Sequence, residues 1–144
     1  MRWRTASYFL SIVGCLLSGC SDVTAPVGGR YVLISIAGAP LPAEYGANTD
    51  YHGRVLADTL LLNAGAGEER IVAQTSLGAA PYTQTTRLVY DVRGNRVEIT
   101  LIPGCPPNAD CVLGHLIGRV TANGIEIDDS NLYRTPLTFA PSQE

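Results

Sequence analysis

The sequence predicts an all-β protein: a single small antiparallel up-and-down barrel, or a strongly curled sheet, of about eight strands. Apolar and polar residues alternate with the two-residue period of strands, and no window keeps the three-to-four spacing of an amphipathic helix. Short turn-forming stretches separate the strands, so consecutive strands are expected to pair in order, and closure would remove the exposed edges. A β-sandwich is the alternative.

The strands are expected between turn signals along the chain. Their predicted ranges are 31–36, 55–62, 71–77, 85–92, 97–101, 116–121, 125–128 and 131–139. The clearest alternation sets Leu88, Tyr90 and Val92 on one strand face. Hairpin turns are predicted at 93–95 and 122–124, where Gly and Asn tolerate positive φ. The pair Glu68-Glu69 is interpreted as a solvated turn, and Pro136 places the last strand at an edge or a bulge.

The first twenty residues predict an export signal. Arg2 and Arg4 precede a ten-residue apolar run, 8–17, whereas a membrane-spanning helix needs roughly 20 apolar residues. Polar residues follow at once, beginning with Ser21 and Asp22. Positive charge, a short apolar segment and small residues are typical of a secretory signal peptide.

The end of this segment resembles a known processing site. Leu17-Ser18-Gly19-Cys20 resembles the lipobox of bacterial lipoproteins at all four positions. The resemblance implies cleavage after residue 19, so that 1–19 is the signal peptide, and acylation of Cys20 as a membrane anchor. In lipoprotein sorting, Ser21 after the cysteine resembles the outer-membrane address. The protein is therefore expected in the cell envelope, on the outer membrane facing the periplasm or at the cell surface.

Two cysteines remain after the signal and the lipidated residue are set aside, Cys105 and Cys111. An exported protein matures where thiols oxidise, and the turn formers between the two residues suit a small disulfide loop. A metal site with His115 is the alternative, although the spacing is longer than zinc ligands usually show and a fourth ligand is missing. Free thiols are a third possibility.

The mature chain predicts one domain. Removing 1–19 leaves 125 of the 144 residues, with a polar tether at 20–29 and the barrel-like domain at 30–144. Of the ten basic residues eight remain, all arginine, against thirteen acids. This mildly acidic balance argues against a nucleic-acid partner.

The domain also resembles a protein family. The stretch 29–42, "GRYVLISIAGAPLP", the hairpins "YDVRGNRVEITL" and "GRVTANGIEIDD", and the closing "NLYRTPLTF" resemble small lipocalin-like bacterial lipoproteins of unassigned function. Lipocalins open with Gly-x-Trp and pack a late arginine on that tryptophan. This chain has Tyr31 at that position, and a stacked Tyr31–Arg134 pair is the expected equivalent.

The sequence offers no catalytic constellation, so we expect no enzyme, no cofactor and no metal. The acids in "EIDDSN" lack the spacing of a calcium loop. If a site exists, the segment from Pro40 to Gly53 is the candidate, because it is the longest loop-like stretch and it gathers Tyr45, Tyr51 and His52.

Two functions follow from these expectations. One is an envelope interaction or structural module held at the membrane by its N-terminal lipid, with an envelope protein as partner. The other is a lipocalin-like binder of a small apolar ligand, which needs a cavity in the barrel.

Overall fold

The computed structural model describes residues 27–45, 53–76, 78–105, 112–131 and 134–142. The described residues form ten β-strands and no helix. The strands are β1 (Gly29–Ile36), β2 (Ala39–Pro40), β3 (Ala43–Tyr45), β4 (Gly53–Asn63), β5 (Ala66–Gln74), β6 (Tyr82–Arg93), β7 (Arg96–Ile102), β8 (Gly114–Thr121), β9 (Gly124–Ser130) and β10 (Leu137–Pro141).

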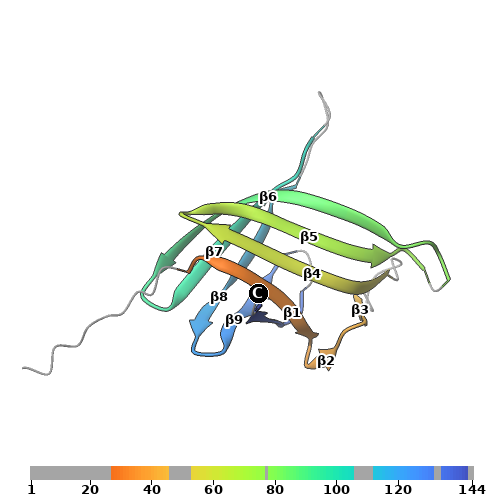
Figure 1. Ribbon diagram of the computed structural model, residues 1–144, viewed down its shortest axis with the longest axis horizontal. Helices are drawn as coiled ribbons and strands as arrows, with labels where there is room; N and C mark the ends of the chain where they lie inside the picture. The colour runs from red at the N-terminus through yellow and green to blue at the C-terminus, as the bar shows by residue number, and fades with distance from the viewer. Residues whose placement is uncertain (1–26, 46–52, 77, 106–111, 132–133, 143–144) are drawn as a thin grey trace, which may run out of the picture.

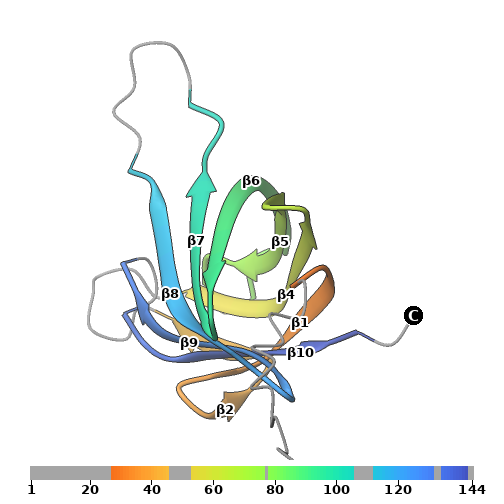
Figure 2. The ribbon, with the colours of Figure 1, turned by 90° about the vertical axis from the view of Figure 1, so that its left-hand side faces the viewer.

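Eight of these strands close into a barrel. From β4 to β10 each strand pairs antiparallel with the next one along the chain. β1 then pairs with β10 on one side and with β4 on the other, from Gly29–Leu62 to Val32–Thr59 (Figure 2). The short strands β2 and β3 pair with β1 and β4 and lie outside this ring. The predicted up-and-down barrel is confirmed, and the sandwich alternative is wrong because closure makes one continuous sheet.

The predicted alternation holds where it was strongest. In β6, Leu88 is buried and Tyr90 and Val92 are half-buried, while the residues between them are exposed. In β7 the apolar positions 97, 99 and 101 are all buried. The hairpin between the two strands turns at Gly94, whose φ of 62° lies in the left-handed region that glycine adopts without strain.

Apolar side chains from seven of the barrel strands form a single buried core, against which half-buried Ile71 of β5 packs. Burying each one stabilises the fold by about 1.5–3 kcal/mol. The buried members of the cluster are Val27, Leu33, Ile36, Ala43, Val55, Leu60, Leu62, Leu88, Val97, Ile99, Leu101, Leu116, Ile125, Ile127, Leu137 and Phe139.

The two ends of the barrel differ. Two-residue turns at 64–65, 94–95 and 122–123 join the strands at one end, which we call the turn end. β1 begins and β10 finishes at this end, and Figure 1 shows the three turns on the left, near the start of β1. The connections at the other end, which we call the loop end, are longer and span 37–52, 75–81, 103–113 and 131–136.

The start of the described chain is fixed at the turn end. Val27 is only 5% exposed and belongs to the core. The Tyr90 hydroxyl donates a hydrogen bond of 2.7 Å to the Val27 carbonyl oxygen. The segment before β1 is therefore attached to the barrel from Val27 onward.

The prediction for the last strand was wrong at residue 131 and over 134–136. Arg134 has a φ of 52°, and the strand begins only at Leu137, after Pro136. The stacked Tyr31–Arg134 pair was also wrong. Tyr31 pairs with Pro141 at the turn end, whereas exposed Arg134 precedes Leu137 at the loop end.

The candidate segment from Pro40 to Gly53 is not wholly a loop. Pro40 belongs to β2, residues 43–45 form β3, and Gly53 opens β4. The free edges of β1 and β4 each accept a short strand there, which satisfies backbone groups that a loop would leave to water. Residues 46–52 lie outside the described part of the chain.

Candidate functional site: a carboxyl pair inside the barrel

A β-bulge turns Asp58 toward the barrel interior. In the β4–β5 ladder Val55 pairs with Ala73, but the next pair is Ala57 with Val72, so Leu56 has no partner residue. The extra residue reverses the inward–outward alternation along β4. Val55 and Asp58 therefore both face inward, and Asp58 is only 1% exposed.

Glu69 joins Asp58 from the neighbouring strand. It lies on the inward face of β5 with Ile71 and Ala73, and it is only 2% exposed. The prediction of a solvated turn at Glu68-Glu69 was therefore wrong for Glu69, because β5 begins at Ala66 rather than near Ile71. The alternation of Ile71 and Ala73, extended two residues back, would have placed Glu69 inside.

The two carboxyl groups are diagonal neighbours. β4 and β5 pair Asp58 with Ile71 and Leu60 with Glu69, which puts the Asp58 and Glu69 Cβ atoms roughly 7 Å apart on the inward face. Across the next ladder Thr86 lies opposite Glu69 and is itself buried. The pair thus lies midway along β4 and β5 against a hydroxyl from β6.

A polar path leads from this pair toward the loop end. Gln84, two residues nearer the start of β6, is exposed, and its Nε2 donates a hydrogen bond of 3.3 Å to Thr86 Oγ1. Polar groups therefore extend inward from Gln84 at the surface to Thr86, Glu69 and Asp58. The path ends where the aliphatic core begins.

Burial controls the ionisation of both acids. It raises the pKa of Glu69 to about 7. Burial first, and then the charge of Glu69, raise the pKa of Asp58 well above its ordinary value. The nearby Thr59 backbone N–H lowers this pKa, but it offsets only part of the rise. The Thr59 N–H lies near Asp58 but outside hydrogen-bond geometry, so neither Asp58 oxygen has a donor, and Glu69 Oε1 has none either.

The described inward faces hold no cation for these acids. The other ionisable residues at inward-facing strand positions are tyrosines: Tyr31 of β1, and Tyr82 and Tyr90 of β6. Burial, and next the neighbouring Tyr90, raise the pKa of Tyr31, so this phenol stays neutral. The inward residues of β7 to β10 are apolar or small and uncharged.

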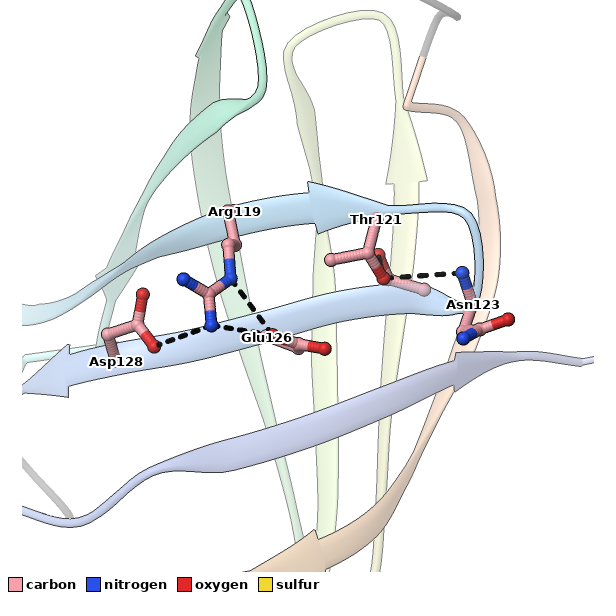
Figure 3. Close-up of polar contacts among 6 residues, drawn as sticks. Arg119, Thr121, Asn123, Glu126 and Asp128 are labelled. Atoms are coloured by element: carbon pink, nitrogen blue, oxygen red, sulfur yellow. Dashed lines mark hydrogen bonds and ion pairs between the residues drawn. The ribbon is translucent and has the colours of Figure 1, made fainter.

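Four acids on the outside of the barrel pair with arginine instead. Arg119 of β8 contacts Glu126 at 2.9 Å and Asp128 at 3.7 Å, both on β9 (Figure 3). On the β6–β7 hairpin, Asp91 and Glu98 each pair with an arginine, at 2.7 and 2.8 Å. The sequence thus supplies arginine to its outer acids and leaves the inner pair without it.

An open hollow of about 620 Å³ lies on the outer surface of β1, β4 and β5. Its lining mixes charged and apolar groups: Arg30, Ala57, Thr59, Leu61, Glu68, Arg70 and Val72. It lies on the opposite face of the sheet from the carboxyl pair, because its β4 and β5 residues alternate with Asp58 and Glu69.

The residues chosen from the sequence are not brought into one site by the described structure. Tyr45 lies in β3, while Tyr51, His52, Cys20 and Cys111 fall outside the described residues. Cys105 is exposed just after β7. Because Cys111 lies outside the described residues, the bridge between the two cysteines stays a prediction.

The metal alternative gains no support from the part of the chain that the structure describes. There, no three His, Cys, Asp or Glu side chains group closely enough to hold a metal ion. His115 lies exposed on β8, where its Nδ1 is 3.4 Å from Thr100 Oγ1.

The described residues also contain no helix with the length and apolar character needed to cross a membrane.

The fold and the inward acids define a closed eight-stranded antiparallel barrel with a carboxyl pair in a largely aliphatic interior. Comparisons with protein-family models, with curated proteins and with solved structures find no match to this chain.

Proposed function

We propose that the chain is a lipid-anchored protein of the bacterial cell envelope whose barrel acts as a non-enzymatic interaction module. In this proposal residues 1–19 are a signal peptide and Cys20 carries the lipid. The likeness of 17–20 to a lipobox supports the anchor. Ser21 favours the outer membrane facing the periplasm, with the cell surface as the alternative.

The difference between the two barrel ends is the observation that carries this proposal. Val27 is buried at the turn end and hydrogen-bonded to Tyr90. Six residues, 21–26, separate Cys20 from Val27, and the seven steps along an extended chain reach roughly 25 Å. A lipid on Cys20 would therefore hold the turn end near the membrane and present the loop end to other envelope components.

Recognition by the loop end agrees with the chemistry of its connections. Loops held by a rigid scaffold commonly carry binding residues. Tyr45, Tyr51 and His52 belong to the β1–β4 connection, and a Cys105–Cys111 bridge would brace the β7–β8 connection. We propose these two connections as the contact surface for an envelope protein.

The anchor is tested by replacing Cys20 with Ala. We expect the variant to lose its partition into the detergent phase, because no diacylglycerol is added to alanine. Cys15→Ala is the matched control, since Cys15 lies within the apolar run and should leave the anchor intact. A Cys20→Ala protein that is cleaved normally and still partitions like wild type contradicts the anchor.

The orientation is tested with a photo-crosslinking residue at two exposed positions in living cells. Ala80 lies in the β5–β6 connection at the loop end, and Asn95 lies in a turn at the turn end. We expect protein crosslinks from Ala80 and lipid crosslinks from Asn95. The reverse pattern contradicts a barrel that displays its loop end.

A second candidate is the lipocalin-like binder. The inward carboxyl pair favours an interior site over a wholly filled barrel, because buried polar groups without a hydrogen-bond partner are costly. The same pair argues against a purely apolar ligand, since such a ligand would leave both acids unpaired.

A further inference from the structure

The carboxyl pair is the feature of the described structure that the fold alone does not explain. Buried polar groups in folded proteins are nearly always hydrogen-bonded. Here Asp58 is 1% exposed with neither oxygen paired, and it lies beside a second buried acid, Glu69. A core that needed only packing would place aliphatic residues at both positions, as β4 does at Leu60 and Leu62.

We propose that Asp58 and Glu69 form a binding site for a small organic cation that carries a primary ammonium group. Three carboxyl oxygens lack a donor: Asp58 Oδ1, Asp58 Oδ2 and Glu69 Oε1. A primary ammonium has three N–H donors and no acceptor. Its donors match the unpaired oxygens in number, and its positive charge is opposite in sign to that of the ionised acids.

The surroundings favour an ammonium over a metal ion. Calcium takes six to eight oxygen ligands and magnesium requires an octahedron. Beside the two acids, the described inward faces supply only the oxygens of Thr86 and Gln84, and no third acid, histidine or cysteine joins them. The remaining neighbours are aliphatic and suit the carbon skeleton of an amine.

The polar path from the loop end gives such a ligand a route to the pair. Exposed Gln84 contacts buried Thr86, which lies opposite Glu69. An ammonium moving inward along these oxygens would keep polar partners until it reaches Asp58. The ligand would then displace any proton that the acids hold.

The site does not depend on the lipid anchor. It gives the second candidate function a ligand class, and it stands or falls separately from the anchored interaction module. Loss of detergent partition tests the anchor, whereas amine binding tests the barrel interior.

The test uses the full chain purified in detergent at pH 7.5, with 2-phenylethylamine as the probe and 2-phenylethanol as its uncharged counterpart. We expect calorimetric binding of the amine and no comparable binding of the alcohol. Glu69→Gln and Asp58→Asn should each weaken amine binding about tenfold or more, because each removes a charge-assisted hydrogen bond. Glu68→Gln is the matched control, since Glu68 neighbours Glu69 on β5 but is exposed on the outer face.

Proton release gives a second readout that needs no variant. Amine binding to the wild type should release protons, seen as a dependence of the binding heat on the ionisation enthalpy of the buffer. Equal binding of the alcohol, unchanged binding by Glu69→Gln, or binding only of calcium or magnesium ions would each overturn the proposal. Absence of any amine binding to the wild type would overturn it as well.

Discussion

Raising the pH should destabilise this barrel, and Glu69→Gln should remove the part of that effect that Glu69 contributes. The pKa of Glu69 is about 7 in the folded chain, against an ordinary 4.5. Between these values the folded state holds a proton that the unfolded state has released, so the free energy of unfolding falls as the pH rises. The stability linked to this proton is complete below pH 4.5 and is lost as the pH passes 7.

The magnitude follows from the size of the shift. Each pKa unit corresponds to about 1.36 kcal/mol, so Glu69 alone should cost about 3 kcal/mol between pH 4.5 and pH 8. The raised pKa of Asp58 adds to this cost with the same sign. Glutamine carries no charge at any pH, and it also removes the repulsion that helps to raise the pKa of Asp58.

Urea unfolding of the chain from Ser21 onward, followed by far-UV circular dichroism at pH 5, 6, 7 and 8, measures this difference. Glu69→Gln should match the wild type near pH 5 and exceed its stability by about 3 kcal/mol at pH 8. Glu68→Gln should follow the wild type throughout, because Glu68 is exposed. A wild-type stability that stays flat from pH 5 to 8, with Glu69→Gln parallel to it, would refute the reasoning.

Three further results are expected. Tyr90→Phe removes the hydrogen bond that attaches the segment before β1 and should lower the free energy of unfolding by about 1 kcal/mol. An unchanged free energy of unfolding would contradict this expectation. Gly124→Ala should cost about 2 kcal/mol or more, because a Cβ there would lie 1.9 Å from a backbone oxygen of β10. Gly94→Ala meets no atom within 4 Å and should cost less in the same urea series, so equal losses would contradict the clash. Cys105 and Cys111 should resist alkylation until the folded protein is reduced, and full labelling without reductant would exclude their bridge.

Local patterns in the sequence determined the class of fold. The alternation of Leu88, Tyr90 and Val92 identified a half-buried strand, because strand side chains point to opposite faces in turn. The turn signals at 93–95 and 122–124 identified hairpins that the structure contains. Such signals depend on neighbouring residues alone, which is why they can be interpreted before the fold is known.

The candidate site required the tertiary structure. Counting in twos from Val55 would place Asp58 on the outward face, whereas the bulge at Leu56 puts it on the inward face with Leu60 and Leu62. A bulge depends on the pairing of two strands, so a single-strand pattern does not reveal it. Glu69 could have been found from the alternation of Ile71 and Ala73, but its burial beside Asp58 depends on the β4–β5 register.

The same distinction applies to the segments that joined the sheet unexpectedly. Residues 39–40 and 43–45 are strands because the edges of β1 and β4 offer unpaired backbone groups, which their own sequence does not indicate. The sequence-based prediction included 134–136 in the last strand, yet Arg134 turns with positive φ before β10 begins. The sequence by itself determined an antiparallel barrel of short strands, because that follows from side-chain period and turn chemistry. The tertiary structure alone decided which acids face the interior, because the direction of a side chain depends on how its strand pairs in register with the neighbouring strand.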